Sequence, residues 1–410
     1  MTSYDAIVVG GRVAGASTAM LLARAGAKVL LLERTPYGSD TLSTHGLMRA
    51  GVLQLSRWGL LDQVVAAGTP PVTRTLFHYP AASPVRISIR ASQGVPALFA
   101  PRRHVLDRIL VDAAAEAGVD VRHGAVATEL LKHPGGRVTG VRGMDDTHGS
   151  FTASARLTIG ADGIRSTVAS AVDAPVERSS AAGGAVLYGY FDGLPTAGYE
   201  WAYGSATAAG LIPTNDGQTC VFVGTTPERM RAARRRGADH AFAELFASAA
   251  PRLTHRLEAA TRTGRLHGWS GQRGHIRRSH GPGWALVGDA GYFRDPITTH
   301  GMTDALRDAE LLAVSVLAAW AGDQPESIAL AGYQAKRDAL SSQLFEVSDR
   351  IAGYAWGPGE IQQLLREVSS AMSDEVGLLQ SLPPRPAPRS RPVEPAMGWI
   401  VAADMTGAGR

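Results

Sequence analysis

Glycine and carboxylate residues recur at three points where the sequence passes from an apolar strand into a turn or helix. The first motif, VVGGRVAG at residues 8–15, follows apolar residues from Tyr4 and precedes small residues with helical spacing. A turn of this kind brings backbone N–H groups close to a pyrophosphate, and the positive end of the helix dipole faces the same anion. Glu33 ends the next apolar strand about 20 residues later, where a carboxylate binds ribose hydroxyls. We therefore predict a dinucleotide site in a βαβ unit formed by residues 4–34.

A second and a third motif place an aspartate at the end of a predicted strand. Residues 157–161 form a buried strand that runs into Asp162-Gly163, a pattern that by itself is typical of a turn. Residues 284–287 form another strand, which ends in Gly288-Asp289. A carboxylate there lies at the carboxyl edge of a sheet and can accept hydrogen bonds from a polyol, while the helix that opens at Gly301 offers its positive end to an anion. Alone this too is a capped turn, but the three motifs in this order predict an extended cofactor site.

The remaining pattern predicts the elements that must position these motifs. Helices are expected at residues 49–67, 104–117, 301–319, 326–352 and 359–378. Strand-like segments at 184–191, 208–212 and 219–223, followed by a helical stretch at about 229–260, indicate an inserted layer. The predicted domains are residues 1–174 for the first part of a Rossmann-like cofactor domain, 175–280 for a substrate-binding sheet layer, 281–325 for the second part of the cofactor domain, 326–380 for C-terminal helices and 381–410 for a Pro/Arg-rich tail.

Composition excludes several classes of protein. The chain has 410 residues, of which 45% are apolar and 19% charged, which is typical of a globular protein. Its single cysteine, Cys220, excludes an intrachain disulfide and a zinc site built from several cysteines, and we predict no metal site. The net charge of +4 and the basic run at 229–236 favour a solvated helix face over a nucleic-acid surface. Because the sequence has no apolar run of about 20 residues and no secretory signal pattern, we expect no membrane span and a cytoplasmic location.

The motifs and their order resemble those of the FAD-dependent monooxygenases of the p-hydroxybenzoate hydroxylase type, within a wider superfamily that includes geranylgeranyl reductases and flavin-dependent halogenases. The resemblance runs from residue 4 to about residue 320 and includes RAGVL at residues 49–53 and the R-x-x-L-D pattern at residues 103–107. It implies an α/β, glutathione-reductase-like FAD-binding fold with an inserted β-sheet substrate layer and a C-terminal helical region. FAD is then the resident cofactor, and NAD(P)H is a transient reductant.

The activity that this resemblance implies is NAD(P)H-dependent monooxygenation of an aromatic or polyketide-like small molecule, as in secondary metabolism. In this family, O2 reacts with the reduced flavin to give a C4a-hydroperoxyflavin, which hydroxylates or epoxidises the substrate. The sequence shows no second Rossmann fingerprint, which fits transient nicotinamide binding. We expect a monomer or a homodimer.

The resemblance also assigns residues to the cofactor. The N-terminal turn and Glu33 would hold the ADP half of FAD, Asp162-Gly163 would help bind FAD and transient NAD(P)H, and Asp289 would hold the ribityl chain. The helix that begins at Gly301 would face the flavin N1–C2=O edge and stabilise negative charge on the reduced flavin. Arg12 replaces the middle glycine of the turn and would offer its guanidinium to the pyrophosphate or to the flavin side. The full set of predicted cofactor-binding residues is Gly10, Gly11, Arg12, Val13, Ala14, Gly15, Glu33, Arg34, Arg103, Val126, Asp162, Gly163, Gly288, Asp289, Pro296, Thr299, His300, Gly301 and Met302.

Two histidines are candidates for acid–base catalysis, because His titrates near neutral pH. His45 follows the ribose carboxylate and His300 follows the Gly-Asp motif, and in this family both loops reach the substrate. Either could abstract a phenolic proton, which makes an aromatic ring electron-rich, or could only hydrogen-bond the flavin or a loop carbonyl. The inserted sheet carries aromatic residues that fit an aromatic pocket and equally fit ordinary sheet packing: Tyr188, Tyr190, Trp201 and Tyr203.

Three alternatives remain open, because the segment after the Gly-Asp motif departs from the monooxygenase pattern. The expected P-x-x-G-x-G-x-N reads PITTHGMT at residues 296–303, which is closer to the reductase and halogenase branches. A flavin-dependent C–C reductase or dehydrogenase of the geranylgeranyl reductase type would insert no oxygen. A halogenase is disfavoured, because GLIP at residues 210–213 stands where W-x-W-x-I-P is expected. A flavin-binding partner without turnover is disfavoured by the chemistry-bearing loops.

Overall fold

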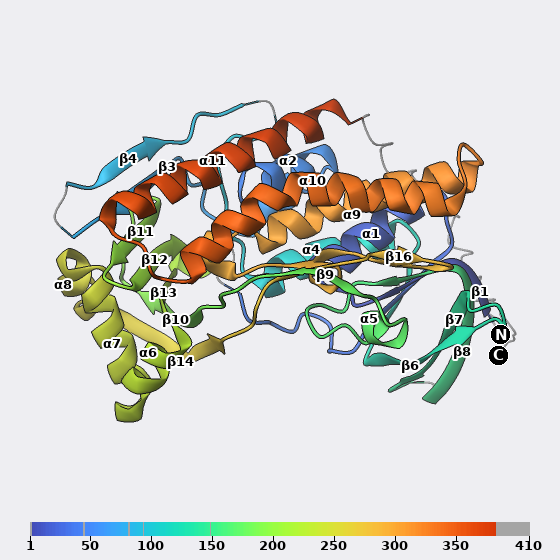
Figure 1. The fold of residues 1–410 in the computed structure, drawn as a ribbon, viewed down its shortest axis with the longest axis horizontal. Helices are drawn as coiled ribbons and strands as arrows, with labels where there is room; N and C mark the ends of the chain where they lie inside the picture. Colours follow the sequence, from blue (N-terminus) through green and yellow to red (C-terminus); the bar gives the residue numbers. More distant parts are fainter. Residues whose placement is uncertain (1, 44–45, 81–82, 93, 148, 383–410) are drawn as a thin grey trace, which may run out of the picture.

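Two β-sheets lie at opposite ends of an elongated molecule, and long helices run between them (Figure 1). The computed structural model describes residues 2–43, 46–80, 83–92, 94–147 and 149–382. Within that part of the chain, none of the helices combines the length and the apolar composition that crossing a bilayer requires.

The sheet that carries all three motifs is built around five parallel strands in the order β17-β8-β1-β2-β5. Its central strands are buried on both faces, which explains their continuous apolar sequence. A short antiparallel strand, β16, extends one edge, and a meander of β6 and β7 pairs with the first half of the long strand β8. The bounds are β1 Thr2–Val9, β2 Val29–Glu33, β5 Asp120–His123, β6 Ala125–Lys132, β7 Val138–Asp145, β8 Gly149–Gly160, β16 His280–Gly281 and β17 Trp284–Leu286.

The second sheet has seven strands in the order β14-β10-β13-β12-β11-β3-β4. Two of its strands, β3 and β4, come from residues 74–88, so the predicted boundary at 174/175 is wrong for this sheet. A parallel pairing between β3 and β11 makes this connection, which joins segments more than a hundred residues apart in the sequence. The bounds are β3 Arg74–His78, β4 Val85–Ser88, β10 Ala185–Asp192, β11 Tyr199–Gly204, β12 Thr207–Pro213, β13 Thr219–Thr225 and β14 Thr261–Ser270.

A third, small antiparallel sheet is formed by one strand that precedes β10 in the sequence and two strands that follow β14. It consists of β9 Val176–Ser179, β15 His275–Arg277 and β18 Tyr292–Phe293. Short 3₁₀ turns complete the connections: η1 Asn215–Gly217, η2 Arg234–Arg236, η3 Pro251–Leu253, η4 Gly288–Ala290 and η5 Pro296–Thr298.

The helices agree with the predicted periodicity in the long elements and break into shorter pieces elsewhere. The stretch at 229–260 forms three helices rather than one, and the stretch at 49–67 forms two. The bounds are α1 Val13–Arg24, α2 Arg49–Arg57, α3 Leu61–Ala66, α4 Arg103–Glu116, α5 Thr167–Ala171, α6 Pro227–Ala233, α7 Ala238–Ala249, α8 Thr254–Glu258, α9 Gly301–Ala321, α10 Glu326–Ala352 and α11 Pro358–Ser381.

The C-terminal helix α11 covers one face of the seven-stranded sheet (Figure 1). Pro358 occupies its first turn, where the missing N–H costs nothing. Ile361, Leu364 and Val368 recur at helical spacing and pack with aromatic side chains of the sheet. The opposite face of the sheet is covered by α6 and α7. The predicted tail lies outside the described residues from position 383 onward.

Candidate functional site

The turn between β1 and α1 has a backbone geometry that only glycine permits. Gly10 has φ of +104°, and a Cβ placed on it would lie 2.4 Å from the carbonyl oxygen of Ala161. A Cβ on Gly15 would lie 1.8 Å from the carbonyl oxygen of Gly10, so α1 approaches β1 very closely. No side chain among the described residues caps α1. The first N–H groups of the helix are therefore available to an external anion.

Glu33, at the end of β2, reaches back to this turn. Its Oε2 accepts a hydrogen bond from the Gly11 N–H at 2.8 Å, and its Oε1 accepts from the Thr35 N–H at 2.9 Å and the Thr35 hydroxyl at 2.7 Å. Burial opposes ionisation, but these hydrogen bonds and the nearby Arg12 hold the pKa of Glu33 below its ordinary value. The carboxylate is thus ionised at neutral pH and borders a cleft that Tyr37 and His123 also line.

Arg12 lines this cleft and is held by three hydrogen bonds within the protein, so a contact of its guanidinium with the pyrophosphate or with the flavin side stays a prediction. Its guanidinium donates to the carbonyl oxygen of Ser39 at 2.7 Å, to Asp107 at 2.9 Å and to the Thr35 hydroxyl at 3.1 Å. Arg103 contacts the same Asp107 carboxylate at 3.2 and 3.3 Å across one turn of α4. The R-x-x-L-D pattern therefore encodes a shared ion pair that fixes both arginines at the edge of the cleft.

The second motif forms a capped turn. Asp162 accepts hydrogen bonds from the Ser166 hydroxyl at 2.5 Å, from the Thr167 N–H at 2.6 Å and from the Thr167 hydroxyl at 2.7 Å. These contacts hold the start of α5, and Gly163 supplies the left-handed residue of the turn with φ of +80°. The carboxylate of Asp162 is engaged by its own turn, so a direct contact with FAD or NAD(P)H stays a prediction.

The third motif packs directly against the first. Gly288 has φ of +59°, and a Cβ on it would lie 2.8 Å from the Cβ of Ala14 in α1. Asp289 follows, and burial raises its pKa to about 7, with Asp304 and Asp308 adding to the rise and Arg103 opposing it. A carboxyl group with this pKa can donate a hydrogen bond to a polyol as well as accept one. The tertiary structure thus brings the first and the third motif into direct contact, although they lie far apart in the sequence.

The loop before α9 is held in a strained conformation. Asp295 accepts from the Ile297 N–H at 2.9 Å and from the Gly184 N–H at 2.6 Å, which ties this loop to the seven-stranded sheet. Thr299 has φ of +52°, a left-handed conformation that costs a β-branched residue about 1–2 kcal/mol. Gly301 is exposed and opens α9 without a side-chain cap from the described residues. Strain beside an open helix N-terminus is typical of a ligand-binding loop.

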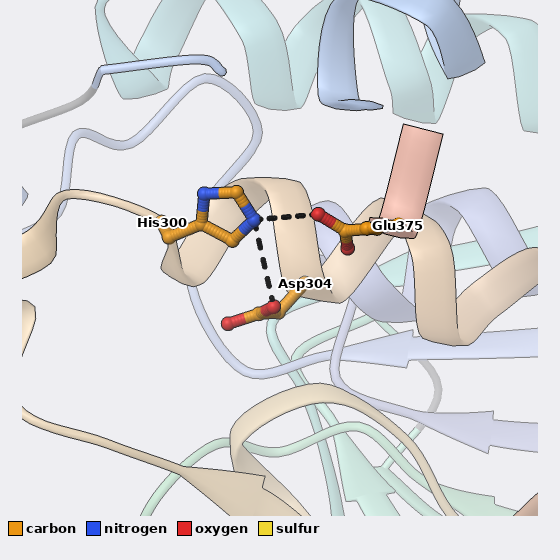
Figure 2. A group of neighbouring side chains, drawn as sticks. All are labelled: His300, Asp304 and Glu375. Atoms are coloured by element: carbon orange, nitrogen blue, oxygen red, sulfur yellow. Dashed lines mark hydrogen bonds and ion pairs between the residues drawn. The ribbon is translucent and has the colours of Figure 1, made fainter. Parts of the chain in front are cut away.

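The His300 side chain is buried beneath this loop rather than exposed to a substrate space. Its Nε2–H donates to Glu375 of α11 at 2.7 Å and lies 3.9 Å from Asp304, as Figure 2 shows. No partner for its Nδ1 occurs among the described residues. Because the residue is 1% exposed and its Nε2 is bonded to Glu375, this geometry does not support the general acid–base role predicted for His300.

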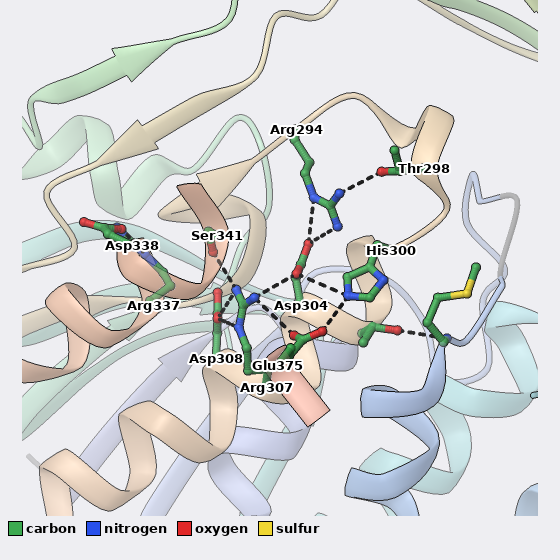
Figure 3. Close-up of polar contacts among 12 residues, drawn as sticks. Arg294, Thr298, His300, Asp304, Arg307, Asp308, Arg337, Asp338, Ser341 and Glu375 are labelled. Carbon is green, nitrogen blue, oxygen red and sulfur yellow. Dashed lines mark hydrogen bonds and ion pairs between the residues drawn. The ribbon is translucent and has the colours of Figure 1, made fainter. Parts of the chain in front are cut away.

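Buried arginines surround His300, Asp304 and Glu375 (Figure 3). Arg294 donates to Asp304 at 2.7 and 3.0 Å, and Arg307 lies 3.1 Å from both Asp304 and Glu375. The histidine and the two carboxylates are close enough to bind a cation. Their negative charge is already balanced by guanidinium groups, so we interpret the cluster as a buried ion-pair network that joins α9, α10 and α11.

The seven-stranded sheet presents an aromatic face toward the same loop. The side chains of Tyr188, Tyr190 and Tyr203 pack in one cluster with Ile297, which lies between Asp295 and Thr299. The Tyr188 hydroxyl accepts from the Ser43 N–H at 3.1 Å, and burial raises the pKa of Tyr188 to about 12. Trp201 and Phe222 belong to the same cluster. The four predicted aromatic residues therefore share one buried face of the sheet.

Some predicted contacts receive no further support. His45 lies outside the described residues. Arg34 is exposed directly after Glu33, and Val126 is 45% exposed on β6 opposite Met144. Their roles in cofactor binding stay predictions.

The residues present fit FAD. Two uncapped helix N-termini, at α1 and α9, offer N–H groups to the pyrophosphate and to the flavin. Glu33 is ionised and suits a ribose hydroxyl, while Asp289 suits the ribityl chain. A side chain at Gly15 or Gly288 would collide with neighbouring atoms. These two glycines therefore allow α1 to approach both the turn after β1 and the Gly-Asp motif.

Comparison with known proteins identifies the family of this chain. The sequence pattern of the FAD-binding domain family matches residues 3–348. The chain belongs to that family. It is an FAD-dependent oxidoreductase of the superfamily that includes monooxygenases, geranylgeranyl reductases and halogenases.

Sequence relatives of this enzyme include archaeal reductases. It is 26% identical to the digeranylgeranylglycerophospholipid reductase of Methanocella arvoryzae over 356 residues, which cover 84% of this chain and 85% of that one. Digeranylgeranylglycerophospholipid reductase 2 of Methanothermobacter thermautotrophicus is 34% identical over 169 residues. That alignment covers 40% of this chain and 41% of the relative, so it spans less than half of either protein.

Solved structures confirm the fold. The flavin-dependent brominase Bmp2 superposes with a TM-score of 0.76 at 18% identity, covering 92% of this chain and 98% of that one. PqsL, a probable FAD-dependent monooxygenase from Pseudomonas aeruginosa, superposes with a TM-score of 0.74 at 20% identity, covering 91% of this chain and all of that one. Both confirm the FAD-binding fold with a sheet layer and C-terminal helices that the sequence predicted.

Sequence reasoning missed the residues that support the site from a distance. The sequence showed Asp107 only as part of the R-x-x-L-D pattern. It did not show that this carboxylate is shared by Arg12 and Arg103. Glu375 lies on the buried face of α11, and its charge at an otherwise apolar position was the available signal. Arg294 and Arg307 gave no comparable signal, because isolated arginines are usually exposed.

Proposed function

We propose that the enzyme is an NAD(P)H-dependent monooxygenase that hydroxylates or epoxidises an aromatic or polyketide-like small molecule. The observation that carries this proposal is the aromatic face of the seven-stranded sheet, which packs against Ile297 in the loop that opens α9. A planar apolar substrate between this face and the flavin would gain stacking and burial.

The overall reaction balances without a further reactant. One substrate, one O2, one NAD(P)H and one proton give the hydroxylated or epoxidised product, one water and NAD(P)⁺. Bound FAD would supply hydride acceptance and oxygen activation. The protein supplies binding, orientation and exclusion of water.

Named residues suit these tasks. Tyr188 stays protonated at neutral pH, because burial raises its pKa to about 12, so its hydroxyl would be able to donate a hydrogen bond to a substrate oxygen. Helix α11 packs Ile361, Leu364 and Val368 into the same cluster as these aromatic residues, and an apolar wall of this kind would keep water from a substrate bound at the edge of the cluster. The N-terminus of α9 at Gly301 would stabilise negative charge on the reduced cofactor.

A second candidate is a flavin-dependent reductase of C–C double bonds. The PITTHGMT segment and the similarity to two archaeal reductases favour it. In that case the substrate would gain a hydride equivalent that originates from NAD(P)H or another reductant, together with a proton from solvent, and no oxygen would be inserted. The same apolar face would bind an isoprenoid chain.

Anaerobic stopped-flow spectroscopy separates the two candidates. The FAD-loaded enzyme is mixed with NADH or NADPH, and bleaching of the oxidised-flavin absorbance is followed with and without aromatic ligands. The reduced enzyme is then mixed with O2, and product mass is measured after incubation in ¹⁸O2. Rapid reduction and one ¹⁸O atom in the product support the monooxygenase. A product two hydrogens heavier without ¹⁸O supports the reductase, and failure of every nicotinamide to reduce the flavin refutes the NAD(P)H-dependent proposal.

A further inference from the structure

The buried face of α11 carries one carboxylate among apolar residues. Ile361, Leu364, Val368, Ala371 and Leu379 occupy the other buried positions of this helix, and Glu375 is 2% exposed. Desolvating a charge at such a position is costly unless partners compensate it. The partners of Glu375 must therefore compensate the cost of burying its charge.

Glu375 connects α11 to the loop that opens α9. Its Oε2 accepts the Nε2–H of His300 at 2.7 Å, and its Oε1 lies 3.1 Å from the Arg307 guanidinium (Figure 2 and Figure 3). A carboxylate acceptor at this distance fixes the proton of His300 on Nε2. His300 stands between the strained Thr299 and the exposed Gly301, so its anchor also holds those two residues.

The charges around Glu375 are nearly balanced. Arg294 and Arg307 are buried cations, and Asp304 and Glu375 are their carboxylate partners. From the same side, Asp308 is buried against Arg307, and Arg337 of α10 lies against Asp338. Neutralising Glu375 alone would remove one negative charge from this network and so make the electrostatic potential beneath the N-terminus of α9 more positive. Buried charge is poorly screened by salt, so its field reaches the neighbouring site.

We propose that Glu375 is a positioning residue of the flavin site, through which the C-terminal helix fixes the loop from Thr299 to Gly301 and lowers the electrostatic potential at the N-terminus of α9. This inference rests on the proposed placement of the flavin at that N-terminus. A reduced flavin carries negative charge, and the α9 N-terminus stabilises it. Glu375 limits that stabilisation and so keeps the midpoint potential of bound FAD low enough for the reduced cofactor to be a strong reductant.

The midpoint potential of bound FAD tests the inference. It is measured by anaerobic dye equilibration on the FAD-loaded full-length protein for wild type, Glu375→Gln and Asp374→Asn, the last being an exposed neighbour on the same helix. Glu375→Gln keeps the size of the side chain and removes its charge. We expect the ratio of reduced to oxidised FAD at a fixed solution potential to rise about tenfold, which is roughly 30 mV for a two-electron couple. Asp374→Asn leaves the potential unchanged.

Two further measurements keep the outcomes distinct. If Glu375→Gln fails to retain FAD, Glu375→Asp and His300→Gln are measured instead. Both keep a carboxylate at position 375, so both are expected to retain a potential near that of wild type while weakening FAD binding through the loop. Equal potentials in wild type and Glu375→Gln, with FAD bound in both, overturn the inference. If instead the wild type binds no FAD, the proposed placement of the flavin fails. The same holds if Glu375→Gln and Gly301→Ala both show the flavin absorbance spectrum of the wild type.

Discussion

Gly15→Ala tests whether the close approach of α1 to β1 forms the cofactor site. The new Cβ would lie 1.8 Å from the carbonyl oxygen of Gly10 and 3.0 Å from the Cβ of Ala161. A carbon and a carbonyl oxygen do not approach closer than about 3 Å, so α1 must move by more than about 1 Å relative to β1. Overpacking of this kind costs about 1–3 kcal/mol, and the rigid backbone oxygen places this site at the upper end.

The displacement falls on the helix N-terminus that would hold the pyrophosphate. We expect the free energy of unfolding of the FAD-free protein to fall by about 2–3 kcal/mol, measured by urea denaturation. We expect FAD affinity, measured by titration of flavin fluorescence, to fall at least about tenfold, since each 1.4 kcal/mol is a factor of ten.

The matched control is Gly332→Ala in α10. No atom outside its own helix backbone and chain neighbours lies within 4 Å of a Cβ built on Gly332. Alanine in a helix interior is favoured over glycine by about 0.5–1 kcal/mol, so this variant should be slightly more stable than wild type and bind FAD equally. Wild-type stability and wild-type FAD affinity in Gly15→Ala would refute the assignment of the turn.

Three further predictions concern other parts of the molecule. Asp289 has a folded-state pKa of about 7 against an ordinary 3.8, so the folded state binds more protons and loses stability as pH rises from 4 to 7. Asp289→Asn should remove up to about 4 kcal/mol of that pH dependence in FAD-free protein. The free energy of unfolding is measured with urea at a series of pH values, and the same dependence on pH in both proteins would contradict this prediction. Asp107→Asn leaves Arg12 and Arg103 without their shared carboxylate and should lower the free energy of unfolding by about 2–3 kcal/mol. Glu116 is exposed on the same helix, so Glu116→Gln should change this free energy by less than about 0.5 kcal/mol. Equal effects of the two substitutions would argue against the shared ion pair. Leu364→Ala opens a cavity under α11 and should lower the free energy of unfolding by about 2–5 kcal/mol. Leu365 is only partly buried, so Leu365→Ala should lower it less, and thermal and urea unfolding can measure the difference.

Much of the cofactor half was predictable from sequence, because its signals are local. The βαβ unit, its Gly-rich turn and Glu33 lie within one short stretch, where apolar runs and glycines dictate strand, turn and helix directly. The long helices after residue 300 were predicted closely for the same reason. The inserted sheet was predicted only in part, because β3 and β4 reach it through a parallel pairing with a distant strand. Pairing between strands far apart in sequence leaves no periodic signal in either one.

The sequence by itself determined which residue types were available to a flavin and in which order they occur. Only the tertiary structure decided how they are used. Arg12 turns to Asp107 because α4 brings a carboxylate within reach, and His300 is enclosed because α11 folds back over the loop and supplies Glu375. The physical reason is that buried charges must be paired, and the partner of a buried charge is set by packing between distant elements rather than by neighbours along the chain.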